Sequence, residues 1–140
     1  MIRYILISLL ILLLPTSAKE HKTEIIGEWL YSEKMDDGLL SSITSYRKNG
    51  EFTIIGILNS KDEYFNYTVK GKWHIKDNVI HYTLTDSNIP KYMKTGDSWT
   101  KAITSLDKKH FKYMYKGQEG SNIRLPMKKA VDTVKPKKKH

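Results

Sequence analysis

The sequence predicts an all-β fold, an antiparallel up-and-down β-barrel of about eight strands. From Ile25 onward, short segments of alternating polar and apolar residues follow one another with turn residues between them, and no long stretch has helical periodicity. In two of the hairpins, one register sorts apolar from polar side chains. A meander with one apolar face must bury that face, and closing into a barrel also removes the exposed edges.

The strands are expected in eight segments joined mostly by short connections, as suits antiparallel neighbours. The two longest connections, at 32–40 and 86–97, are expected to be loops. The expected strands span 26–31, 42–47, 51–58, 63–75, 79–85, 98–106, 110–116 and 121–127.

The first hairpin that can be checked surrounds an Asn-Gly pair. A three-residue loop that ends in Gly50, with this glycine in the left-handed conformation, pairs Tyr46 with Phe52 and Arg47 with Glu51. The aromatic rings then share one face and the charges share the other. A two-residue loop would mix the faces, so the sequence favours the longer loop.

The second hairpin turns at residues 77–78. A two-residue loop pairs Trp73 with Tyr82 on one face and His74 with His81 on the other. A slip of one residue would destroy this sorting, so the register is well specified.

The sorted faces predict the core. The inward row of the long strand is expected to be Phe65, Tyr67, Val69, Gly71, Trp73 and Ile75. The rest of the expected core comprises Trp29, Tyr46, Phe52, Ile54, Ile80, Tyr82, Leu84, Ile103, Phe111 and Tyr113.

The first 18 residues have the parts of a cleavable export signal. One positive charge at Arg3 precedes a ten-residue apolar run at 5–14, and Pro15 and small residues up to Ala18 follow. A membrane-spanning helix needs about 20 apolar residues, so we expect cleavage after Ala18 and a periplasmic or secreted protein with no stable membrane anchor. The chain has no cysteine, so we expect neither a lipid anchor, nor a disulfide, nor thiol chemistry.

The formal net charge of +9 is concentrated at the C-terminus. Residues 128–140 hold six lysines and one aspartate, and they are expected to form a flexible tail after a single barrel domain at 19–127. Such a tail either aids solubility as a solvated segment, which we favour, or attracts anionic polymers and lipid surfaces. Nucleic acid is not an expected partner of an exported chain.

Several motifs resemble those of small bacterial lipocalin-like domains. Gly27-Glu28-Trp29 resembles the lipocalin G-x-W signature, the run from Tyr46 to Phe52 resembles their aromatic hairpin, and Gly71-Lys72-Trp73 resembles their second G-x-W strand. The likeness covers residues 24–127. It implies a lipocalin-like barrel in which Gly27 and Trp29 are structural, with Trp29 packed across the closed end.

The leading functional hypothesis is the binding of one small hydrophobic or amphiphilic ligand inside the barrel. An eight-stranded barrel either fills with side chains or holds one small ligand, and both outcomes stay open. The alternative is a protein-binding or enzyme-inhibitor module that uses the loops and the outer face. The candidate lining residues are Tyr46, Phe52, Phe65, Tyr67, Tyr82 and Tyr113, and Ile89, Tyr92 and Met93 are expected in a loop at the mouth, which either covers it or packs on the barrel end.

No catalytic set and no complete metal site is recognisable in the sequence. His74 and His81 should lie side by side on the outer face, but metal sites usually need three or four ligands. The acidic pairs at 36–37 and 62–63 fall in expected turns and are interpreted as solvated. We therefore expect that the protein is not an enzyme and has neither cofactor nor metal. We also expect a monomer.

Overall fold

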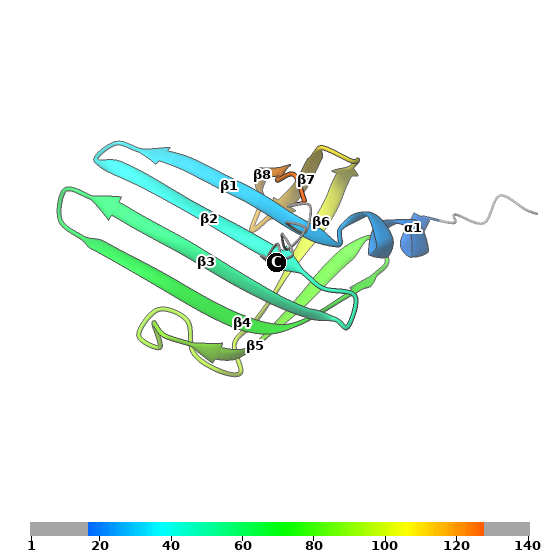
Figure 1. The fold of residues 1–140 in the computed structure, drawn as a ribbon, viewed down its shortest axis with the longest axis horizontal. Coiled ribbons are helices and arrows are strands. Elements are labelled where there is room, and N and C mark those ends of the chain that lie inside the picture. The colour runs from blue at the N-terminus through cyan, green and yellow to red at the C-terminus, as the bar shows by residue number, and fades with distance from the viewer. Residues whose placement is uncertain (1–16, 128–140) are drawn as a thin grey trace, which may run out of the picture.

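Eight antiparallel strands follow one another in sequence order and close into a barrel, as the computed structural model shows (Figure 1). The structure describes residues 17–127. The predicted fold class is confirmed. One short helix, α1 (Ser17–Glu24), precedes the strands, which are β1 (Gly27–Met35), β2 (Gly38–Tyr46), β3 (Glu51–Ser60), β4 (Tyr64–Lys76), β5 (Val79–Ser87), β6 (Ser98–Leu106), β7 (His110–Tyr115) and β8 (Gln118–Arg124).

The expected loop at 32–40 is wrong, because this segment belongs to a hairpin. β1 and β2 continue to a tight turn at Asp36 and Asp37, and Glu33 pairs with Leu40. The residues 32–37 are almost all polar, so the alternation that marks a half-buried strand fades near the barrel mouth. The pairing of β2 with β3 continues over the same stretch, so backbone pairing holds a segment that side-chain pattern alone does not reveal.

The last hairpin also differs from its expected boundaries. β7 ends at Tyr115, and β8 begins at Gln118 and ends at Arg124. Lys116 and Gly117 form a two-residue turn, with φ values of 49° and 76°. Positive φ at both central residues is the geometry that matches the twist of a tight hairpin.

The β2–β3 and β4–β5 hairpins have the strand pairing that the sequence predicts. Tyr46 lies opposite Phe52, and Gly50 has a φ of 81°. In the β4–β5 hairpin, Trp73 lies opposite Tyr82. Asp77 and Asn78 have φ values of 53° and 59°, as a two-residue primed turn requires.

The core lies inside the barrel and matches the predicted inward rows except at Phe65, which is half-buried and stacks on Tyr92 of the β5–β6 loop instead of joining the buried cluster. Val69 and Trp73 are buried and Tyr67 and Ile75 pack against the buried cluster, which also includes Ile25. Ile25 precedes the barrel and was not among the predicted core residues. The fully buried large side chains are Trp29, Tyr82, Phe52, Phe111, Ile25, Ile80, Leu84 and Val69.

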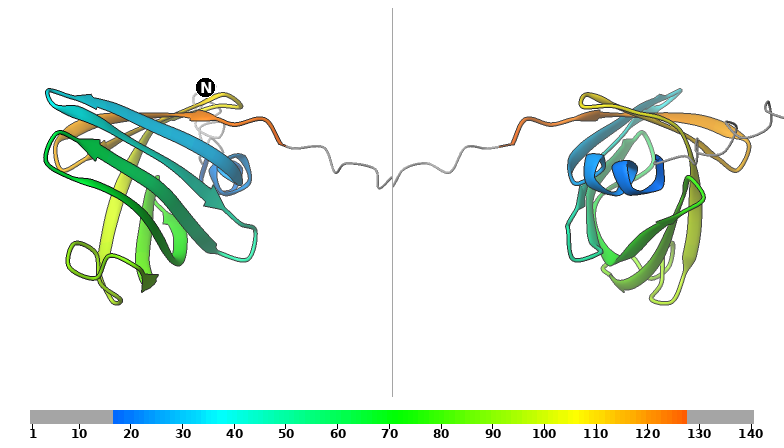
Figure 2. Two further views of the ribbon diagram at one scale, coloured as in Figure 1. Left: turned by 60° about the vertical axis from the view of Figure 1, so that its left-hand side comes forward. Right: turned by 90° about the vertical axis from the view of Figure 1, so that its right-hand side faces the viewer.

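The helix α1 lies across one end of the barrel, as the right-hand view of Figure 2 shows. This end also receives the β2–β3, β4–β5 and β6–β7 turns, and it is called the closed end below. The other end, with the β1–β2, β3–β4 and β7–β8 turns and the β5–β6 loop, is called the open end. Ile25 follows α1 directly and is completely buried, so the segment before β1 plugs the barrel.

The barrel closes between its first and last strands over a short ladder. β1 and β8 pair only through Trp29 with Arg124 and Leu30 with Ile123. One further backbone hydrogen bond runs from the Leu125 N–H to the Glu28 carbonyl, at 2.8 Å. By contrast, β1 and β2 pair along their whole length, from Gly27 to Met35. The seam between β1 and β8 is therefore much shorter than the β1–β2 ladder.

The expected export signal and basic tail lie outside the described residues, except for Ser17 and Ala18, which open α1. Within residues 17–127, no helix is both long and apolar enough to cross a membrane.

Candidate ligand-binding lumen

Aromatic side chains fill the lower half of the lumen, toward the closed end. The Phe52 and Tyr82 rings meet edge to face with centroids 5.4 Å apart, and Tyr82 stacks on Trp99 at 5.0 Å. Tyr46 meets Trp73 edge to face at 5.4 Å. These contacts join residues of β2 to β6 into a packed floor near the closed end.

A pair of phenols lies buried in this floor. The hydroxyl oxygens of Tyr46 and Tyr82 are 2.5 Å apart, and either one can be the donor. Burial raises the pKa of both phenols above the ordinary value of 10.0. Both groups therefore stay neutral at physiological pH and act as hydrogen-bond donors and acceptors, not as charges.

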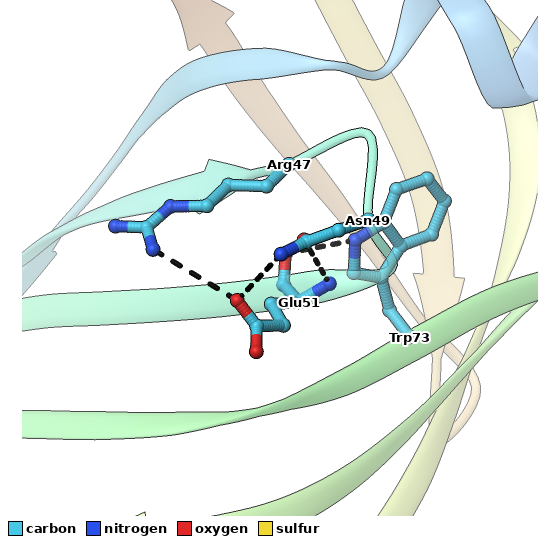
Figure 3. A network of polar contacts seen from close by, with 4 residues as sticks. All are labelled: Arg47, Asn49, Glu51 and Trp73. Carbon is cyan, nitrogen blue, oxygen red and sulfur yellow. Dashed lines mark hydrogen bonds and ion pairs between the residues drawn. The ribbon is translucent and has the colours of Figure 1, made fainter.

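The second tryptophan of the G-x-W resemblance is fixed by the β2–β3 hairpin (Figure 3). The indole N–H of Trp73 donates to the carbonyl of Glu51 at 3.0 Å. The Asn49 amide donates to the Glu51 carboxylate at 2.7 Å, and the Asn49 side-chain oxygen accepts from the Glu51 N–H at 3.0 Å. The two Asn49–Glu51 hydrogen bonds hold the turn, and the Glu51 carbonyl provides a hydrogen-bond partner for the indole N–H of the buried Trp73.

The first tryptophan is held in the same manner at the closed end. Trp29 is completely buried, and its indole N–H donates to the Ile25 carbonyl at 2.7 Å. The guanidinium of Arg124 covers the Trp29 ring, donates to the Ile26 carbonyl at 2.7 Å and also donates to the Glu24 carbonyl. Trp29 is therefore packed at the closed end.

In the upper half, two tyrosine rings lie against glycines of the neighbouring strand. Tyr67 of β4 pairs with Gly56 of β3, and Tyr113 of β7 pairs with Gly120 of β8. A Cβ at Gly56 would lie 2.2 Å from the Tyr67 ring, and a Cβ at Gly120 would lie 2.3 Å from the Tyr113 ring. Both rings occupy the space that a side chain would otherwise take, so they lie along the barrel wall.

The open end has polar groups at its rim. The Tyr31 hydroxyl donates to the carboxylate of Glu33 at 2.6 Å. Tyr31 follows Trp29 on the inward row of β1 and is half-buried, whereas Glu33 is exposed. Burial and the nearby Glu33 charge raise the pKa of Tyr113 to about 12. The rim carboxylate therefore lies close enough to influence the upper lumen.

The β5–β6 loop folds back on the open end. Ile89 and Met93 pack against the core cluster. The Tyr92 ring stacks on Phe65, with centroids 5.6 Å apart and nearly parallel planes, and its hydroxyl donates to Glu63 at 3.1 Å. Of the two interpretations of this loop, the structure favours packing on the barrel end.

Lys101 of β6 is the polar residue of the lumen that the sequence analysis missed. Trp99, Lys101 and Ile103 are half-buried, while Thr100 and Ala102 between them are exposed. The Lys101 ammonium lies 4.2 Å from the ring centroid of Tyr113 and 5.7 Å from that of Tyr82. Burial lowers the pKa of this amine from 10.5 to about 8.

The predicted lining residues separate into two groups. Tyr46, Phe52 and Tyr82 belong to the packed floor, where the Tyr82 ring contacts those of Tyr46 and Phe52. Phe52 and Tyr82 also contact Trp99. Phe65, Tyr67 and Tyr113 belong to the upper half, where Phe65 and Tyr67 are half-buried and Tyr113 is buried. A pocket at the closed end is lined by Gly27, Glu28, Leu125 and Met127.

The two histidines lie side by side as predicted. His74 pairs with His81, and their rings stack with centroids 4.8 Å apart. Within residues 17–127, no group of three or more His, Asp or Glu residues is arranged to hold a metal ion.

The chain matches no protein-family model, and no curated protein matches its sequence. Among solved structures, a lipocalin-like protein from Bacteroides uniformis is similar, with 18% identity and a TM-score of 0.51 over 73% of this chain and 99% of that one. An uncharacterized protein from Bacteroides eggerthii is 18% identical, with a TM-score of 0.46 over 71% of this chain and 98% of that one. The first likeness shows that the fold is a lipocalin-like barrel.

Proposed function

We propose that this chain is an exported binding protein, not an enzyme, and that it holds one small hydrophobic or amphiphilic molecule in the upper half of the barrel. The observation that carries the proposal is the position of Tyr67 and Tyr113. Each ring lies against a glycine of the next strand, so these large side chains line the lumen wall and do not cross the lumen. The partial exposure of Tyr67 and Phe65 supports an opening to solvent.

The chemistry of the wall suits an amphiphile. A tyrosine presents an apolar ring with one polar hydroxyl, and sites for small molecules are mostly apolar with a few polar groups that fix orientation. The packed floor limits the depth of the site. An eight-stranded barrel is wide enough for a single small ligand, so we expect a stoichiometry of one.

The binding site is tested by filling it with a larger side chain. Leu58 lies on the inward row of β3 at the open end, and Ile57 beside it faces outward with 45% exposure. Leu58→Trp should block the upper lumen, whereas Ile57→Trp adds the same side chain outside. Binding is measured by the fluorescence of N-phenyl-1-naphthylamine, a neutral apolar probe.

We expect saturable binding to the native chain and to Ile57→Trp, and at least about a tenfold loss for Leu58→Trp, because displaced apolar contacts are worth about 1.4 kcal/mol or more. Absence of saturable binding to the native chain, or equal binding by both variants, would contradict the proposal. Circular dichroism of each variant verifies that the barrel is intact.

Export is proposed from the sequence and has its own test. The charged start, the ten-residue apolar run and the small residues before Lys19 support cleavage after Ala18. Expression of the whole chain in a bacterium should give a periplasmic or secreted product whose measured mass equals that of a chain beginning at Lys19. Removal of residues 1–18 should retain the protein in the cytoplasm, and continued export without them would refute the signal.

A further inference from the structure

The lumen contains a lysine whose ammonium has no ionic partner among residues 17–127. The described ion pairs are Arg47 with Glu51 and His110 with Asp107, both on the surface. Lys101 instead lies over the ring faces of Tyr113 and Tyr82. Ring faces attract a cation but accept no strong hydrogen bonds, so the three ammonium hydrogens remain available.

The tyrosines near Lys101 are neutral groups. The hydroxyls of Tyr46 and Tyr82 share one hydrogen bond, and since each carries one hydrogen, one of the two hydrogens is left over. The raised pKa values of these phenols and of Tyr113 keep them uncharged, so none of them serves as a counter-ion.

The carboxylate whose charge contributes to the raised pKa of Tyr113 is Glu33, at the rim. It is exposed, it accepts the hydrogen bond of Tyr31, and it forms no ion pair with Lys101. A desolvated cation that lies among neutral groups and has no ionic partner is an incomplete site. Its most favourable complement is an anion that brings acceptor oxygens into the lumen.

We propose that Lys101 is the anion-binding residue of the lumen and holds the carboxylate of a single-chain amphiphile, whose apolar chain extends past Tyr67 and Phe65 toward the open end. This inference rests on the proposed ligand-binding function and defines its ligand class. The carboxylate would accept hydrogen bonds from the ammonium, with the Tyr46–Tyr82 pair next to it. The flat rings of Tyr67 and Tyr113 would contact the chain.

The test compares decanoate with decanol, which has the same chain length but no charge, by isothermal titration calorimetry at pH 7. The native chain should bind decanoate about tenfold more tightly than decanol, because a charge-assisted hydrogen bond is roughly twice as strong as one between neutral groups. Lys101→Met should abolish this preference, because it weakens decanoate binding more than decanol binding. Lys101→Arg should keep the preference, and Lys112→Met, an exposed residue on β7, is the matched control.

The outcomes separate this inference from the proposed function. If the native chain binds decanol and decanoate equally, or if Lys101→Met keeps the preference, the lumen still binds apolar chains but Lys101 does not select carboxylates. If neither compound binds the native chain, the proposed function fails and the role of Lys101 fails with it.

A measurement on the native chain avoids any effect of substitution on folding. The carboxyl carbon of 13C-labelled decanoate, followed by NMR, should titrate at lower pH when bound than when free, since a neighbouring ammonium favours the carboxylate. The charged or titratable groups facing this site are Lys101, Tyr46, Tyr67, Tyr82, Tyr113 and, at the rim, Tyr31 and Glu33. An unchanged or higher titration point would overturn the proposal.

Discussion

The guanidinium carbon of Arg124 lies 4.3 Å from the ring centroid of Trp29. The same guanidinium donates to the carbonyls of Ile26 and Glu24. One side chain from the last strand thus covers the ring at the barrel floor and also fixes the segment that plugs it. This arrangement joins the two ends of the barrel domain.

Arg124→Lys should destabilise the barrel by about 1–2 kcal/mol, because an ammonium cannot reproduce the planar, forked hydrogen bonding of a guanidinium. Arg47→Lys is the control: its ion pair with Glu51 is exposed and long, at 4.0 Å, so its loss should change stability by less than about 0.5 kcal/mol. Urea unfolding followed by tryptophan fluorescence measures both. If Arg124→Lys were as stable as the native chain, the Arg124 contacts would not stabilise the barrel.

The Tyr46–Tyr82 hydroxyl pair predicts a non-additive response. Tyr46→Phe or Tyr82→Phe alone should cost about 1–3 kcal/mol, since each leaves a buried hydroxyl without its partner. The double variant removes both hydroxyls and should cost little more than either single one. Urea unfolding of the four proteins gives the coupling energy. Strict additivity would mean that the hydroxyls do not interact.

The tyrosine–glycine pairing predicts a steric penalty that can be rescued. Gly56→Ala places a methyl group within 2.2 Å of the Tyr67 ring, so it should destabilise the barrel by about 1–3 kcal/mol. In a Tyr67→Leu background the same change should cost much less, because the ring is gone. Thermal unfolding of the four proteins tests this, and an equal cost in both backgrounds would exclude the clash.

Lys101 predicts a dependence of stability on pH. Burial lowers the pKa of this amine from 10.5 to about 8 in the folded chain. Below pH 8, both folded and unfolded chains carry the proton, and the folded chain has the full desolvation cost. Between pH 8 and 10.5 the unfolded chain binds more protons, so this contribution to stability rises with pH.

Lys101→Met should therefore be more stable than the native chain at pH 7, and the difference should shrink by pH 10. Comparison of the two proteins at each pH cancels the titration of the tyrosines that they share. Urea unfolding at pH 7, 8.5 and 10 measures the difference. A difference that stays constant with pH would show that Lys101 is fully solvated.

The parts of the fold that were predictable are those in which side-chain sorting and turn chemistry agree. The β4–β5 hairpin is the best example, since its turn residues permit positive φ and only one register separates Trp73 from His74. The prediction of a loop at 32–40 was wrong because this segment is mostly polar near the rim, so its side chains do not alternate between an apolar and a polar face. The helix α1 was not predicted, because eight residues are too few to show helical periodicity.

The missed residues of the lumen are polar, and this explains why they were missed. In β6, the alternation of the strand places Lys101 on the same inward face as Trp99 and Ile103. Because a lysine is usually solvated, its residue type argued against an inward position. In β8 the usual polarity is reversed. Asn122 is buried while Ile123 is 55% exposed, and Arg124 shares the inward parity of Asn122.

The short seam between β1 and β8 has a mechanical consequence. The start of β1 and the end of β8 lie together at the closed end, so opposing forces on the two ends of the domain would separate the pair at its terminus. Hydrogen bonds loaded in this direction break one after another and do not share the load. Under tension, the barrel should yield first at the Trp29–Arg124 and Leu30–Ile123 pairs, at a low force, and open into a sheet before its longer ladders rupture.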